Sequence, residues 1–318
     1  MRWRKLGRIF DPTEHQLANG CEFYAQSPQV LTRGETVRVY FSTRARDGDK
    51  YVSHIAYVDF AEDLRQILGV NEQSVIGLGG LGDFDEHGIF PMNVLRVGDE
   101  VFGYTCGWNR RVSVSVDTAI GLVTSTDDGT TFVRSGRGPV LGPSIHEPFL
   151  VGDGFVLLED GRFHMWYIFG TSWRRFEPDS APDRTYKIGY ATSSDGVAWQ
   201  KRHEGQQIIP DALGPDEAQA LPTVTRIDGR YHMFFCYRQS SGFRSDPDRG
   251  YRIGHAVSDD LSTWTRDDSD PALVGTPGEW DSDMQCYPHV FRWREQVYLL
   301  YNGNEFGKYG FGLAVLEQ

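Results

Sequence analysis

Three segments of the chain repeat one pattern: IGLVTSTDDGTTF at 120–132, IGYATSSDGVAW at 188–199 and IGHAVSDDLSTW at 253–264. In each segment an alternating run leads into a Ser/Asp/Gly turn, and an aromatic residue then opens the next run. This order is typical of a β-hairpin. Partial copies begin at 55–58 (IAYV) and 311–315 (FGLAV). The pattern therefore predicts five similar units.

A second strand pair is expected ahead of each hairpin. Its first strand begins at a proline in four units, at Pro28, Pro91, Pro222 and Pro288, whereas the third unit has Asp153-Gly154 there. Proline is tolerated at the first residue of a strand because no ladder bond is lost. An aromatic-rich strand follows in every unit, at 37–41, 101–105, 163–168, 231–237 and 297–301.

Four strands in each of five units predict an all-β fold, a single five-bladed β-propeller with four antiparallel strands per blade. One domain would then span residues 1–318. The fifth unit ends after its third strand, so we expect residues 3–9 to supply the fourth strand and close the ring. The one helix expected is short, at 61–68, and ends before Gly69.

Composition disfavours several classes of protein. Lys and Arg number 32 against 44 Asp and Glu, and the net charge of −12 argues against nucleic-acid or membrane-surface partners. The four cysteines lie far apart with no Cys-x-x-Cys pair, which disfavours zinc and redox sites. No apolar run reaches the roughly 18 residues of a spanning helix, and the N-terminus does not resemble a secretory signal. A cytoplasmic protein is expected.

Strand direction sorts the polar residues between the two ends of the ring. Residues ahead of an innermost strand share one end with residues that follow the antiparallel second strand. The hairpin turns that hold Asp127, Asp195 and Asp260 lie at the other end. Because Asp in such a turn usually caps its own backbone, we expect these three residues to be structural.

Acidic residues recur five to seven positions ahead of the proline or its equivalent, as Glu22, Asp85, Glu147, Asp216, Glu217, Asp281 and Asp283. The second strands end with aromatic, amide and guanidinium side chains, namely Trp108, Asn109, Arg110, Trp173, Tyr237, Arg238, Asn302 and Asn304. Converging loops would place both sets around one funnel suited to a carbohydrate or sugar conjugate. We expect the second set, with Glu22 and Asp216, to bind the substrate.

Cleavage of a glycosidic bond uses one protonated carboxyl as acid and a second as base or nucleophile. We expect Asp85, Glu147, Glu217 and Asp283 to supply these groups, because they come from different blades. Glu147 is the first choice for the acid, since apolar and aromatic sequence neighbours would keep it protonated. Asp85 is the first choice for the base or nucleophile.

The Ser-x-Asp-Gly-x-x-Trp hairpins and five units resemble the propeller glycosidases of families 43, 32, 68 and 130. Segments 107–110 with 119–122, and 301–304 with 307–315, resemble more closely small bacterial propeller proteins described as glycosylases. The resemblance spans nearly the whole chain and implies a hydrolase that acts on O-glycosyl bonds. Families 43 and 32 typically place Asp-Pro on the first inner strand, where this chain has Ser27-Pro28.

Other functions stay open. The arginines that follow the second strands suit a glycoside phosphorylase or an enzyme for an anionic sugar, although they could equally pair with loop acids. A propeller can also bind sugar without catalysis. No metal-ligand spacing or nucleotide-binding glycine loop is found, so no cofactor is expected. His289 alone raises the alternative of a structural cation at the centre of the ring, as in some related propellers.

Overall fold

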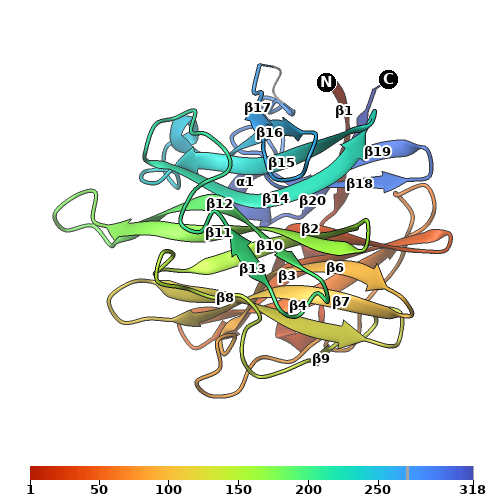
Figure 1. The fold of residues 1–318 in the computed structure, drawn as a ribbon. Helices are drawn as coiled ribbons and strands as arrows, with labels where there is room; N and C mark the ends of the chain where they lie inside the picture. The colour runs from red at the N-terminus through yellow and green to blue at the C-terminus, as the bar shows by residue number, and fades with distance from the viewer. Residues whose placement is uncertain (270–271, 318) are drawn as a thin grey trace.

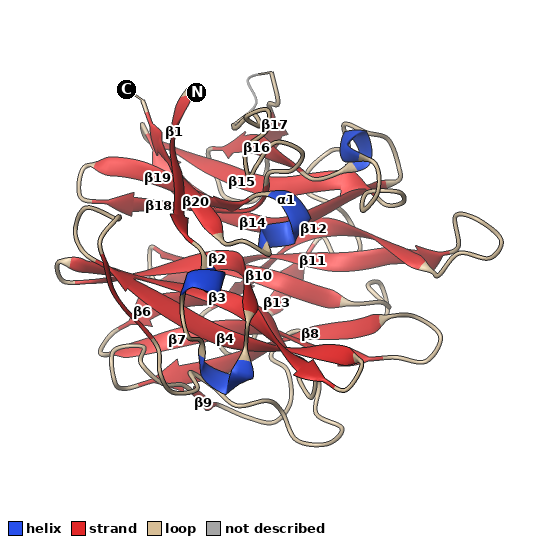
Figure 2. Ribbon diagram, turned by 180° about the vertical axis from the view of Figure 1, so that it is seen from behind, coloured by secondary structure: helices blue, strands red, loops and turns tan. Residues whose placement is uncertain are grey.

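The computed structural model describes residues 1–269 and 272–317. This part of the chain is built almost entirely of β-strands (Figure 2). It contains one short helix, α1 (Asn304–Gly307), and the 3-10 turns η1 (Pro12–Glu14), η2 (Ala18–Gly20) and η3 (Pro247–Arg249). No helix in the described ranges is long and apolar enough to cross a membrane. The predicted all-β class is confirmed.

The strands follow one another in antiparallel groups of four (Figure 1). The first group is β2 (Phe23–Arg33), β3 (Thr36–Asp47), β4 (Lys50–Phe60) and β5 (Ile67–Val70). The second is β6 (Gly88–Val97), β7 (Glu100–Arg110), β8 (Val116–Ser125) and β9 (Val133–Arg134). The third is β10 (Val151–Glu159), β11 (Arg162–Arg174), β12 (Asp183–Ser193) and β13 (Gln200–Arg202).

The fourth group is β14 (Glu217–Ile227), β15 (Arg230–Gln239), β16 (Arg252–Ser258) and β17 (Thr265–Arg266). The last group is β18 (Cys286–Trp293), β19 (Gln296–Asn302) and β20 (Phe311–Leu316), joined by the N-terminal strand β1 (Trp3–Phe10). β1 pairs antiparallel with β20, so the two ends of the chain lie side by side (Figure 1). By hydrogen bonding, the first two groups form one eight-stranded sheet through a single parallel pairing of Ser53 with Gly88.

The first strands of the groups contact one another in a closed cycle. β2 contacts β6, β6 contacts β10, β10 contacts β14, β14 contacts β18, and β18 contacts β2. Apolar side chains fill the space between successive groups. Trp166 and Ile188 of the third group, for example, pack with Val224 and Met233 of the fourth, and all four are buried. Burial of such faces between sheets is the main force that holds the groups together.

The hairpin turns have the structural role predicted from the sequence. The carboxylates of Asp127, Asp195 and Asp260 each accept hydrogen bonds from backbone N–H groups of their own turn. In Asp260 these bonds lower the pKa of the carboxyl to about 2. The repeated aspartates therefore shape the turns.

The helix predicted at 61–68 is wrong. Leu64 has a left-handed backbone with φ 57°, and the Asp63 carboxylate accepts hydrogen bonds from the N–H groups of Arg65 and Gln66. From Ile67 the chain enters β5 and pairs with β4. A side chain that bonds to nearby backbone competes with helix formation, and the pairing with β4 then outweighs local propensity.

Candidate active site

A cavity of about 540 Å³ is lined by residues from all five strand groups. It lies where the first strands begin and the second strands end, the end of the molecule that strand direction indicated. Its volume is within the range of small-molecule sites. The lining comprises Tyr24, Gln26, Arg44, Tyr51, Ser53, Phe90, Cys106, Trp108, Val116, Thr118, Leu150, Asp153, Ile168, Arg184, Tyr186, Ala220, Arg238, Phe243, Arg244, Tyr251, Tyr287 and Phe306.

Each of the five first strands is interrupted by a bulge where it meets the cavity. The register shifts between Gln26 and Gln29, Ile89 and Met92, Gly152 and Phe155, Ala220 and Thr223, and Cys286 and His289. Ser27, Asp153, Leu221 and Tyr287 at these bulges have left-handed φ angles of 49–56°. Bulges near active sites often redirect a side chain, and such backbone strain outside glycine tends to occur at functional positions.

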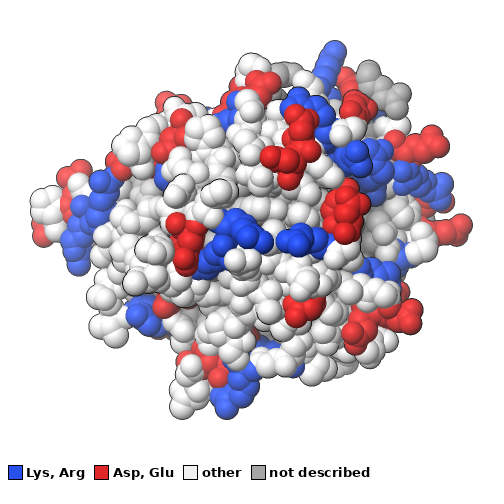
Figure 3. Space-filling view, in the orientation of Figure 1, with Lys and Arg blue, Asp and Glu red and all other residues white. Residues whose placement is uncertain are grey.

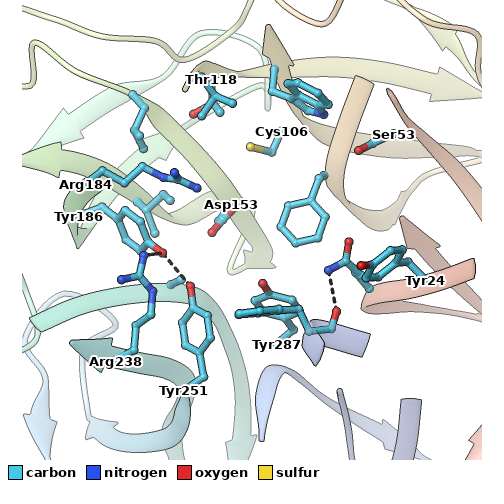
Figure 4. Close-up of a pocket in the computed structure, with 18 of the residues that line it drawn as sticks. Tyr24, Ser53, Cys106, Thr118, Asp153, Arg184, Tyr186, Arg238, Tyr251 and Tyr287 are labelled. Carbon is cyan, nitrogen blue, oxygen red and sulfur yellow. Dashed lines mark hydrogen bonds between the residues drawn. The ribbon is translucent and has the colours of Figure 1, made fainter. Parts of the chain in front are cut away.

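Asp153 is the one carboxylic acid that lines the cavity within the described residues. Its side chain lies near the middle of Figure 4 and is only 7% exposed. Burial raises the pKa of Asp153 to about 7, although the charge of Arg184 and hydrogen bonds from the Cys106 thiol and the Leu221 N–H act in the opposite direction. Near neutral pH this carboxyl can therefore hold a proton and release it to a bound substrate.

Aromatic side chains form much of the remaining lining. Phe90 and Trp108 come from the second group, and Tyr24 and Tyr51 come from the first. Tyr24 lies across the cavity from Arg184 and Tyr186 (Figure 4). A large apolar face with a polar edge can stack on a sugar ring while accepting or donating hydrogen bonds.

Four arginines line the cavity: Arg44, Arg184, Arg238 and Arg244. Arg244 lies 3.5 Å from the Asp183 carboxylate, whereas Arg44 lies over the ring of Tyr24 and Arg238 over the ring of Phe243. On the face shown in Figure 3, by contrast, basic and acidic side chains are interleaved. The cavity thus concentrates positive charge in a chain whose net charge is −12.

The buried acids predicted to be catalytic lie outside this lining, in ion pairs. Each acid precedes the first strand of its group and meets a cation from the outermost strand of the same group. The pairs are Asp85–Arg134 at 2.5 Å, Glu147–Lys201 at 2.5 Å, Glu217–Arg266 at 2.6 Å and Asp281–Lys5 at 2.7 Å. A buried carboxylate requires such a partner. We therefore interpret these acids as braces between the innermost and outermost strands.

The surroundings of Glu147 differ from the apolar environment expected for a general acid. Besides Lys201, it accepts hydrogen bonds from the Tyr167 hydroxyl and the Gly205 N–H. The sequence neighbours that suggested an apolar setting are not the residues that surround the carboxylate in space.

Two of the predicted binding residues, Trp108 and Arg238, line the cavity. Asn302 is fully buried instead, where it accepts a hydrogen bond from the Ser27 N–H and so joins the last strand group to the first. Asn304 accepts hydrogen bonds from the backbone N–H groups that precede β18. Both amides therefore stabilise the backbone beside the cavity.

Arg110 and Asp216 are also absent from the lining. Arg110 lies 2.8 Å from Asp47, and Asp216 pairs with Arg174. For these residues the structure agrees with the simpler alternative, pairing of arginines with acids in the loops.

The other predicted site residues do not line the cavity either. Trp173 and Tyr237 are half-buried under the guanidinium groups of arginines. Asn109 lies on β7 next to Trp108, while Glu22 and Asp283 are exposed ahead of β2 and β18. An exposed loop acid has no buried partner to direct it, so its position in the sequence alone could not place it in the funnel.

Sequence reasoning missed Asp153, Arg44 and Arg184. Asp153 had a recognisable signal, because it occupies the position that directly precedes proline in the other four units. Those positions hold Ser27, Phe90, Leu221 and Tyr287. An acid in one unit at a place where the others have uncharged residues marks a break in the repeat.

His289 does not fit the cation ligand suggested by the sequence. Its Nε2 accepts a hydrogen bond of 3.1 Å from the Val30 N–H, and burial lowers the pKa of the imidazole to about 3. The ring is then neutral with its proton on Nδ1, which is buried without a partner. That nitrogen offers a donor rather than a lone pair. In the described ranges no three His, Cys, Asp or Glu side chains group as a metal site.

Two curated relatives align with the entire chain. They are the uncharacterized proteins MT1551 and Rv1502 of Mycobacterium tuberculosis, each 34% identical over 318 residues and covered in full. This chain and those two proteins belong to one family. No protein-family model matches the sequence.

Solved structures of similar fold come from carbohydrate-active enzymes. A complex of BT0996 with RGII has a TM-score of 0.71 at 16% identity, over 99% of this chain and 91% of that one. A β-1,2-mannobiose phosphorylase from Listeria innocua gives 0.67 at 12% identity, over 98% and 95%. A thermostable family-43 glycoside hydrolase gives 0.62 at 14%, over 94% and 91%. At these identities the likeness shows the fold, which is of the propeller-glycosidase type.

Proposed function

We propose that this chain is a carbohydrate-active enzyme that cleaves or transfers a glycosidic bond in the central cavity, with Asp153 as the general acid. The observation that carries the proposal is a buried carboxyl with a pKa raised to about 7 among aromatic and cationic lining residues. The fold shared with glycoside hydrolases and a phosphorylase supports it.

We also propose that the fold is a five-bladed propeller in one domain, closed by β1. The eight-stranded sheet then counts as two blades, which touch in the sheet only where Ser53 pairs with Gly88. The closed cycle of contacts among β2, β6, β10, β14 and β18 supports this count.

In this mechanism Asp153 gives its proton to the oxygen of the departing group as the glycosidic bond breaks. The roles first assigned to Asp85 and Glu147 are not retained, because both carboxylates are engaged in buried ion pairs. With no second carboxyl in the described lining, the attacking group has to be activated differently. An anion such as inorganic phosphate needs no protein base, so activity should be assayed both with and without phosphate.

The test is a panel of aryl glycosides, furanosides included, assayed with the purified protein. We expect Asp153→Asn to lower kcat by at least 10²-fold, the effect of losing a general acid. Glu147→Gln is the matched control, since it removes a buried carboxyl outside the cavity and should preserve turnover per folded molecule. Full activity of Asp153→Asn would disprove the assignment. Saturable sugar binding without any turnover would indicate a binding module instead.

A further inference from the structure

Arg238, on β15, is buried next to the cavity without a counter-ion. It is 1% exposed, and its guanidinium donates to the Gln239 carbonyl and the Tyr186 hydroxyl, both of which are neutral. Its Nε has no hydrogen-bond partner among the described residues. Leaving a guanidinium out of water without a negative partner is costly, typically several kcal/mol. The molecule therefore keeps a positive charge here that its own described side chains do not neutralise.

The adjacent tyrosine pair adds an unused hydrogen-bond donor. The Tyr186 and Tyr251 hydroxyl oxygens lie 2.7 Å apart, and Arg238 Nη2 donates to Tyr186 at 2.8 Å (Figure 4). One hydroxyl hydrogen is used between the two tyrosines, whichever of them donates. The other has no acceptor among the hydrogen bonds of the described residues. Burial raises the pKa of Tyr251 well above its usual value, so both hydroxyls stay protonated.

We propose that Arg238, Tyr186 and Tyr251 form an oxyanion-binding subsite of the cavity, and that the enzyme's ligand carries a carboxylate or phosphate at this place. The three side chains present a charge and spare N–H and O–H donors, which a group with several acceptor oxygens can satisfy together. A neutral sugar hydroxyl would leave the buried charge unbalanced.

Arg184 lies on β12 two residues from Tyr186, close enough to add a second cation to the same side of the cavity (Figure 4). Two sources could supply the oxyanion: a substituent on the sugar, as in a uronic or phosphorylated sugar, or inorganic phosphate bound as a co-substrate. The proposal deepens the proposed function by naming the chemistry of its ligand. Because binding is measured without turnover, it can fail or succeed separately from that function.

The experiment is calorimetric titration of the whole protein at constant ionic strength with four probes: glucuronate, glucose 6-phosphate, inorganic phosphate and neutral glucose. We expect at least one anionic probe to bind at least tenfold more tightly than glucose. Tyr251→Phe, which removes the hydroxyl but keeps the ring, should weaken that binding about tenfold or more, the effect of losing a hydrogen bond to a charged group. Arg184→Gln should weaken it as well.

Tyr231→Phe is the matched control, because the Tyr231 hydroxyl bonds to Glu159 outside the cavity lining. Preference for the anionic sugars over phosphate would identify a sugar substituent, and competition by phosphate alone would identify a co-substrate. Either result supports the subsite. Binding of glucose as tight as that of all three anions, or equal losses in Tyr251→Phe and Tyr231→Phe, would overturn it. Anion binding with no glycoside turnover would refute only the enzymatic function.

Discussion

Asp153 owes its raised pKa to the bulge that holds it. The left-handed backbone at φ 51° places the residue within a β-strand that borders the cavity, where the side chain loses most of its contact with water. Burial disfavours the ionised form, and the charge of Arg184 offsets this only in part. A carboxyl that titrates near 7 is suited to proton transfer at neutral pH.

The same burial predicts a pH-dependent cost to stability. The folded pKa of about 7 exceeds the ordinary 3.8, so the folded state binds a proton more tightly than the unfolded chain. The contribution of Asp153 to the free energy of unfolding then falls as pH rises from about 4 to about 7, by an amount on the order of 4 kcal/mol. Asp153→Asn should therefore gain stability relative to the natural protein over this interval, as measured by urea denaturation.

Asp259→Asn serves as the control for that comparison, since the Asp259 side chain is 76% exposed and carries no burial cost. Its stability difference from the natural protein should change little with pH. A difference for Asp153→Asn that is equally flat from pH 4 to 8 would show that the carboxyl is not penalised by burial.

At the residue scale, sequence could indicate the types of side chain but not their partners. Trp108 and Arg238 were predicted to reach the cavity and do so. Glu147 and Glu217 were placed at the correct end of their strands, yet each turns to a cation some 50 residues later in the chain. Which of several nearby acids meets a cation is decided by packing in space, and single-sequence periodicity carries no such information.

At the scale of the blade element, the acid–cation pair is a recurring brace. It ties the loop ahead of the innermost strand to the outermost strand, which is short in the second, third and fourth groups. β9 and β17 have two residues each and β13 has three. Strands this short make few ladder bonds of their own, so the pair supplies a fixed point.

Arg266→Met should expose the strength of this brace. It leaves the fully buried Glu217 without its cation, and removing one partner of a buried pair typically costs about 3–5 kcal/mol. The double variant Glu217→Gln with Arg266→Met should recover part of that loss, because no unpaired charge then remains. Denaturant unfolding of both variants measures the difference. Equal stability of the single variant and the natural protein would contradict a bracing role.

The hairpin elements were the most predictable part of the fold. Their Ser-x-Asp turns are specified locally, by a side chain that caps the next few N–H groups. The segment at 61–68 was misjudged because its outcome depends on pairing with β4, a contact that local propensity does not include.

At the scale of the whole molecule, the N-terminal strand joins the last sheet. β1 pairs with β20, and Lys5 lies 2.7 Å from the buried carboxylate of Asp281. The repeat made this pairing predictable, since the last unit lacked a strand. The cavity's excess of arginine over acid was not predictable, because its members come from five separate groups.

A chain that lacks residues 1–10 should therefore be severely destabilised, as it exposes the edge of β20 and leaves Asp281 without Lys5. Removing this buried pair's cation alone should cost about 3–5 kcal/mol. A synthetic peptide of residues 1–10, added in excess, should raise the Tm of the truncated chain. The same peptide with Lys5→Met should raise it less. A truncated chain with the Tm of the natural protein would show that β1 is dispensable.

The central claim is that one buried carboxyl in the cavity titrates near neutral pH, and carboxyl NMR of the protein labelled with ¹³C at the aspartate side chains tests it without any substrate. We predict one aspartate signal with a pKa of about 7 that disappears in Asp153→Asn and persists in Asp259→Asn. If the signal removed by Asp153→Asn instead titrates below pH 5, Asp153 is ionised at neutral pH and cannot be the acid.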